Sequence, residues 1–123
     1  MKSKDELIHE IGKLVVQDDR YGDHEWSAIS IVGRVRDDAA SITGYLYDGE
    51  EEWEGATPNS MEFPALLQEL RRVMQADVGG DPWKSCLIQI KREDLSVGVK
   101  FEYENEDLWT NDLPTLHDRL RPS

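Results

Sequence analysis

The chain has 123 residues, with 26 Asp and Glu against 14 Lys and Arg and a formal net charge of −12. This length is enough to bury a sizeable core, so residues 1–123 are expected to fold as a single domain. The charge argues against direct binding to nucleic acid or to an anionic membrane, because phosphates and anionic headgroups would repel it, and it favours a basic protein partner.

The first predicted element is a helix from Lys4 to Gln17. Its start, Ser3-Lys4-Asp5-Glu6, has the S-x-x-E form of a capping box. Apolar residues then recur at the 3.6-residue spacing that buries one helix face: Leu7, Ile8, Ile11, Leu14 and Val15. The following DDRYGDHE segment is typical of a turn.

From Glu25 the period changes to two, which predicts a strand. One face of this strand has Ile29, Ile31 and Val35, and the other has Ser30, Val32, Arg34 and Arg36. Asp37-Asp38-Ala39 is short enough for a hairpin turn, and Ser41 to Tyr47 predicts an antiparallel partner strand.

A second helix is predicted after Asn59 or Ser60 as its cap, with Pro64 in the first turn. Its apolar stripe consists of Phe63, Leu66, Leu67, Leu70, Val73 and Met74. Gly79-Gly80 ends it. Two further strands follow, Lys84 to Lys91 with Cys86, Ile88 and Ile90 inward, and Ser96 to Tyr103 with Val97, Val99, Phe101 and Tyr103 inward. Pro114 opens a short final helix that carries Leu116 and Leu120.

The order helix, two strands, helix, two strands and a short helix predicts an α+β domain. We expect a single antiparallel sheet of about four strands with helices packed on one face. The other face is expected to meet water, and its predicted residues are Arg34, Arg36, Thr43, Tyr45, Gln89, Lys91, Lys100 and Glu102.

The sequence offers no convergent set of catalytic residues. His9, His24 and His117 lack the spacing of paired metal ligands, and Cys86 lies on an apolar strand face, where a thiol is not activated. Nucleophile-elbow, phosphate-loop and EF-hand patterns are absent from the sequence. We therefore expect a protein that is not an enzyme and has no cofactor and no metal.

The single cysteine also excludes an internal disulfide, which suits a reducing compartment. No apolar run approaches the roughly 20 residues of a membrane span, and MKSKDELIHE carries charges where a signal peptide needs an apolar core. A cytoplasmic protein is expected.

Acidic residues gather with aromatic ones in two segments that are candidate partner-binding sites. The first, Tyr47 to Ala56, contributes Asp48, Glu50, Glu51, Glu52, Trp53 and Glu54, and the second contributes Glu102, Glu104 and Glu106. A third acidic patch contains Asp18, Asp19, Asp23 and Glu25. Carboxylates this close repel each other, and a basic partner relieves that repulsion. A solvated loop is the alternative interpretation of the first segment.

Several segments together resemble one protein family. They are LIHEIGKLVV, the Glu25-Trp26 strand start, FPALLQELRRVM, GGDPWKSCLIQI and VGVKFEYE. Over Leu7 to Asp107 the chain resembles the YezG-like immunity proteins, the antitoxins of bacterial polymorphic toxin systems. It departs from the family pattern at the end, where DLPTLHDRLRPS replaces an aromatic-rich tail, and in the turn from Lys91 to Leu95, which lacks Asp-Gly.

The resemblance implies a cytoplasmic protein that binds and neutralises a cognate toxin domain, often a nuclease. It supplies no catalytic residues. A nuclease holds phosphates and is therefore basic around its active site, which agrees with the acidic composition of this chain. Two other classes stay open: an adaptor or chaperone-like module for another basic protein, and a small enzyme that uses scattered carboxylates.

Overall fold

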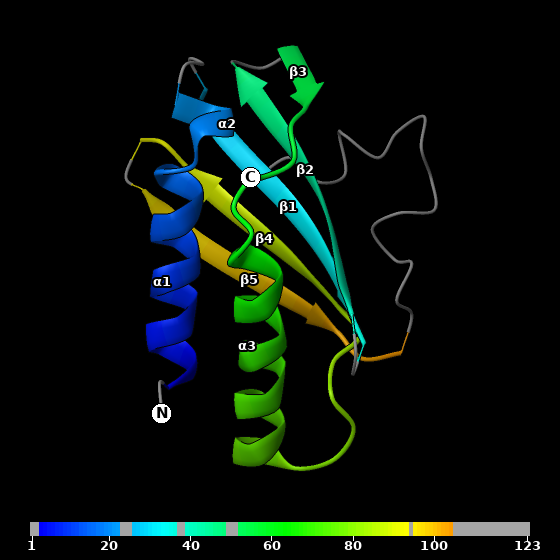
Figure 1. Cartoon of the computed structure of the whole chain (residues 1–123). Helices are drawn as coiled ribbons and strands as arrows, with labels where there is room; N and C mark the ends of the chain where they lie inside the picture. The colour runs from blue at the N-terminus through cyan, green and yellow to red at the C-terminus, as the bar shows by residue number, and fades with distance from the viewer. Residues whose placement is uncertain (1–2, 23–25, 37–38, 49–51, 94, 105–123) are drawn as a thin grey trace.

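The computed structural model describes residues 3–22, 26–36, 39–48, 52–93 and 95–104. Two long helices lie side by side on one face of an antiparallel sheet (Figure 1). The predicted α+β class and the placement of the long helices on one face are confirmed.

The elements follow the chain in the order α1 (Lys4–Val16), α2 (Asp19–Gly22), β1 (Ala28–Val35), β2 (Ala40–Asp48), β3 (Glu52–Gly55), α3 (Phe63–Val78), β4 (Ser85–Lys91) and β5 (Ser96–Glu102). Two of them were not expected from the sequence. The DDRYGDHE segment contains the short helix α2, and the acidic stretch contains the strand β3. The predicted helix at Pro114 lies outside the described residues. No helix in the described ranges is long and apolar enough to cross a membrane.

The sheet has five strands in the order β3-β2-β1-β4-β5, and each neighbouring pair is antiparallel. The strand β1 therefore lies at the centre, with β2 and β4 on its two sides. The predicted sheet of about four strands gains one member because β2 pairs with β3, from Tyr45 opposite Gly55 to Asp48 opposite Glu52.

Local signals in the sequence explain most helix ends. Ser3 Oγ accepts the backbone N–H of Glu6 at 3.2 Å, so the Ser3 half of the predicted capping box forms. The helix α3 has Pro64 in its first turn and ends at Gly79, where φ is +80°. The predicted cap of α3 is wrong, because the capping position is Glu62 and its side chain makes no capping hydrogen bond.

The core fills the space between the helices and the sheet. It is formed by Leu7, Ile11 and Val15 of α1, the stripe of α3 from Phe63 to Met74, and the inward residues of the central strands. Trp26 and Trp83 join it. The predicted inward faces of α1, α3, β1 and β4 are thereby confirmed.

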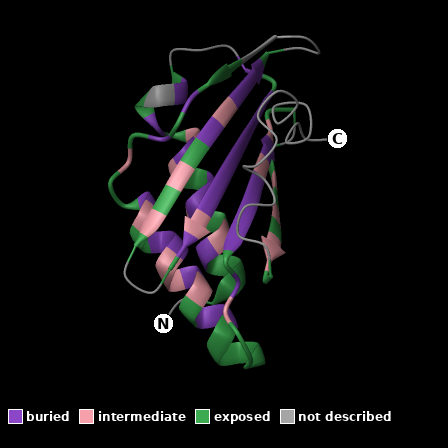
Figure 2. Ribbon diagram, turned by 90° about the vertical axis from the view of Figure 1, so that its right-hand side faces the viewer, coloured by how far each residue is buried: buried purple, intermediate pink, exposed green. Residues whose placement is uncertain are grey.

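The expectation of a wet second face is wrong at the middle of the sheet. On the central strands Ser30, Val32, Ser85 and Leu87 are all at most 2% exposed, and Tyr47 of β2 is fully buried. Figure 2 shows this burial along the central strands. The prediction holds for the residues named on that face, because three of them are exposed and five are partly buried. The exposed residues are Arg36, Thr43 and Lys100. Tyr103, predicted inward, is 47% exposed because it follows the last paired residue of β5.

Asp18 links the end of α1 to the segment that leads into α3. The residue is only 6% exposed, and its two carboxylate oxygens accept the backbone N–H groups of Asn59 at 3.2 Å and Ser60 at 3.0 Å. The backbone of the two residues expected to cap α3 is therefore held by a side chain from the segment between α1 and α2. Asp18 belongs to the structure of the fold rather than to an exposed acidic patch.

A close backbone approach fixes the same segment a few residues earlier. Ala56 N–H donates to the carbonyl of Gly44 at 2.9 Å, and the hydroxyl of buried Tyr21 donates to the Ala56 carbonyl at 2.7 Å. A Cβ atom at position 44 would collide with that carbonyl oxygen. Glycine is required at this position because no other residue leaves the space.

Replacing Asp18 with Ala is expected to lower the free energy of unfolding by roughly 2–3 kcal/mol, because two hydrogen bonds to a charged acceptor are lost. Chemical denaturation measures the change. Asp19→Ala, at the exposed neighbouring position, is the control and should change stability by no more than about 0.5 kcal/mol. Equal effects of the two substitutions would contradict the role of Asp18.

Candidate functional site

The first predicted acidic segment is a strand pair at one margin of the sheet. Asp48 ends β2 and is exposed, and Glu54 of β3, opposite Leu46, is exposed as well. Position 53 pairs with Tyr47, and position 52 pairs with Asp48. Glu50 and Glu51 lie outside the described residues. The segment from Glu52 onward is thus part of the sheet rather than a free loop.

The second predicted segment lies at the opposite margin. Glu102 ends β5 and is partly buried, Glu104 is exposed, and Glu106 lies outside the described residues. Through the strand register, Asp48 and Glu102 are three strand spacings apart and seven residues apart along the sheet. With about 4.8 Å between strands and about 3.4 Å per residue, the separation is roughly 28 Å. The two segments therefore do not form one compact patch.

A different acidic site, not predicted from the sequence, lies between the two long helices. It is a groove of about 660 Å³ lined by Asp5, Glu6, His9, Glu10, Lys13, Leu14 and Gln17 of α1 and its C-cap, and by Glu62 and Leu66 at the start of α3. Four of these nine residues are carboxylates, and one is a lysine.

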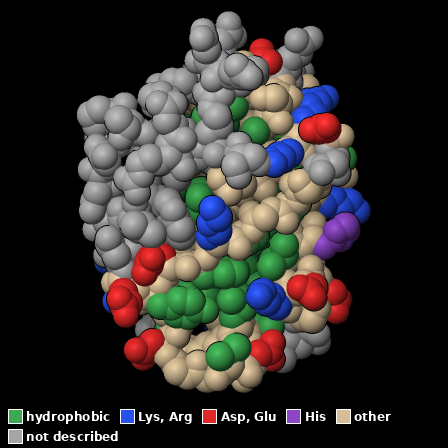
Figure 3. All heavy atoms as spheres, turned by 180° about the vertical axis from the view of Figure 1, so that it is seen from behind, with side chains coloured by type: hydrophobic (Ala, Val, Ile, Leu, Met, Phe, Trp, Pro, Cys, Tyr) green, Lys and Arg blue, Asp and Glu red, His purple; other side chains and the backbone are tan. Residues whose placement is uncertain are grey.

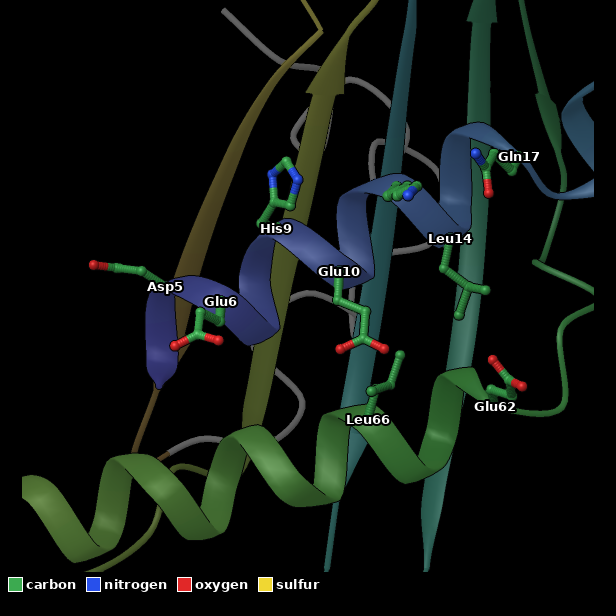
Figure 4. Close-up of a pocket in the computed structure, with 9 residues that line it drawn as sticks. Asp5, Glu6, His9, Glu10, Leu14, Gln17, Glu62 and Leu66 are labelled. Carbon is green, nitrogen blue, oxygen red and sulfur yellow. The ribbon is translucent and has the colours of Figure 1, made fainter. Parts of the chain in front are cut away.

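The side chains of the groove meet from both helices. Figure 4 shows Glu10 and Leu14 directed from α1 toward α3, and Glu62 and Leu66 at the start of α3 directed toward α1. Leu66 is buried and Leu14 is half-buried, whereas Glu6 and Glu62 are exposed. The groove therefore has an apolar floor and carboxylates along both walls.

This arrangement suits a long cationic side chain. The methylene stem of a Lys or Arg can lie on Leu14 and Leu66 while its charged end stays near the carboxylates in water. Because the groove is open to solvent, several residues of a partner can approach it at once. The groove is thus a candidate interaction surface for a basic protein segment.

The described residues can be compared with the residue types considered for metal binding and nucleophilic chemistry. They contain no group of three or more His, Cys, Asp or Glu side chains able to hold a metal ion. His9 is exposed at the groove. Cys86 is fully buried, and this burial raises its pKa to about 12, against a smaller opposing effect of a hydrogen bond with the Gly33 backbone. Its thiol is therefore neutral at physiological pH.

A signal for the groove is present in the sequence. Asp5, His9 and Lys13 are spaced by four residues, as are Glu6 and Glu10, so they share the polar side of the first helix. What the sequence does not reveal is that α3 begins beside the end of α1. That placement depends on the long-range contact between Asp18 and the backbone of Asn59 and Ser60.

Comparison with protein-family models and with curated proteins finds no match to this chain.

Cys86 is expected to react with a thiol reagent at least roughly 100-fold more slowly in the folded protein than in denaturant at pH 8, because burial blocks access and keeps the thiol protonated. Stopped-flow absorbance with a disulfide reagent measures both rates. Fast modification of the folded protein, with its circular dichroism unchanged, would contradict the assigned environment.

Proposed function

We propose that this protein is a cytoplasmic immunity protein that binds and neutralises a cognate toxin domain with a basic surface, such as a nuclease. The resemblance to YezG-like immunity proteins suggests the class. The acidic groove between α1 and α3 is the observation that supports binding to a basic partner.

The electrostatics of the groove favour this kind of partner. Its charged residues give a formal charge of −3 with His9 neutral, on a chain whose net charge is −12. The local and overall charges have the same sign, so a basic domain is attracted at long range and then positioned at short range. A nucleic acid would be repelled by the same field.

Inhibition follows if the bound surface of the toxin includes the residues that hold its phosphate substrate. Lys and Arg side chains engaged by Glu6, Glu10 and Glu62 are then unavailable to a substrate. Binding beside the active site would instead hold the toxin in an inactive arrangement. Both routes require the same contact between acidic groove and basic domain.

The test replaces three groove carboxylates without reversing their charge, in the variant Glu6→Gln, Glu10→Gln, Glu62→Gln. The partner is the C-terminal domain of a toxin encoded next to the gene for this chain, with co-purification as the first step. We expect the association rate constant to fall by about tenfold at low salt and the binding free energy to weaken by roughly 1–3 kcal/mol. Surface plasmon resonance at two salt concentrations measures both.

The matched control removes the same charge at exposed positions that do not line the groove, at the end of α3, in the following turn and in the turn between β4 and β5, in the variant Asp77→Asn, Asp81→Asn, Glu93→Gln. It should bind nearly as well as the original protein. Equal weakening by the two variants would mean that only overall charge matters.

A further variant locates the contact among the acidic surfaces. Reversing Glu50, Glu51, Glu52 and Glu54 to Lys should weaken binding by several kcal/mol if the partner meets the acidic segment at β3 instead of the groove. We expect the groove variant to have the larger effect per charge. No binding to any adjacent toxin domain would contradict the proposed function itself.

A further inference from the structure

The strand β5 has one hydrogen-bonding side without a strand partner among the described strands. It pairs with β4 along all seven of its residues and ends the sheet on that side. The opposite end of the sheet is the four-residue strand β3. Short, acidic end strands resist pairing with another chain, whereas a longer end strand is a template for it. The strand β5 is the longer of the two.

Apolar side chains lie along the strand β5, which has this open side. Val97, Val99 and Phe101 are only partly buried against the core, and Tyr103 just beyond them is 47% exposed. Phe101 packs on Trp83 with ring centroids 5.3 Å apart, and Lys4 Nζ lies 5.7 Å from the centroid of Phe101. Figure 3, which views the molecule from behind, shows hydrophobic side chains gathered on this side of the molecule and bordered by charged ones.

We propose that β5 pairs antiparallel with β5 of a second copy of this chain, about a two-fold axis next to Phe101. Such pairing would continue the sheet across the dimer and satisfy the open backbone groups around Phe101 in both strands. Because directly opposite residues point to the same face, the partly buried apolar residues of the two copies meet on the helix side.

The sequence of β5 is complementary to itself in this register. Lys100 lies opposite Glu102 of the second copy, and Glu102 opposite Lys100, so two ion pairs form on the face away from the helices. Val99 lies opposite Tyr103, and Phe101 opposite its own copy. The Glu102 carboxylate accepts the backbone N–H of Glu104 at 3.0 Å, which positions it at the end of the strand.

Charge exchange tests the register. Lys100→Glu places two carboxylates opposite each other, and Lys100 is exposed, so the fold should persist. The double variant Lys100→Glu, Glu102→Lys restores opposite charges across the axis. Sedimentation velocity over a wide range of concentration should show a dimer of about twice 14.1 kDa for the original protein, at least a tenfold weaker dimer for the single variant, and recovery for the double variant.

Arg72→Glu is the control, because it makes the same change in net charge at an exposed position of α3. It should leave the dimer intact. A protein that stays monomeric at every concentration would overturn the proposal, and so would a dimer that Lys100→Glu and Arg72→Glu affect equally. Circular dichroism of each variant verifies that the fold is retained.

Discussion

The contact between Asp18 and the backbone of Asn59 and Ser60 sets the geometry on which the candidate site depends. Its partners are about forty positions away along the chain, and they immediately precede α3. The contact brings the start of α3 to the end of α1, so that Leu66 and Glu62 face α1 across the groove. A single buried carboxylate therefore organises a surface made mostly of exposed carboxylates. The same residue type has a structural role at one position and a proposed recognition role at others, and burial distinguishes the two.

The sheet is covered by the long helices on one face, yet its centre is buried on both. Ser30 and Val32 of β1 and Leu87 of β4 are inaccessible on the side away from these helices. This burial leaves the helix layer, the margins of the sheet and a few exposed positions of the far face, such as Thr43, as contact surfaces of the described residues. The acidic groups at β3 and at the end of β5 lie at opposite corners of the sheet, so a compact partner can engage only one of them together with its surroundings. The groove between α1 and α3 is a third surface, distinct from both corners.

Much of the fold could be predicted from the sequence because it is encoded in local periodicity. The helix α1, the strands β4 and β5, and the end of α3 at Gly79 follow from apolar spacing and from the conformational freedom of glycine. The errors arise where long-range contacts override local signals. Asn59 and Ser60 resemble helix caps but donate to Asp18, and Glu52 to Gly55 resembles a solvated loop but pairs with β2. The groove could not be predicted because its two walls come from helices whose relative placement no local pattern specifies.

The short strand β3 has a consequence for how far assembly can proceed. A sheet with two long open sides can add copies without limit and grow into a filament, whereas a sheet with one usable side stops after a single pairing. In this protein the second side is only four residues long and carries glutamates at positions 52 and 54. The strand β3 therefore disfavours the further pairing that would extend a β5 dimer into a filament. The two glutamates of β3 thus oppose pairing with another chain whether or not a partner binds there.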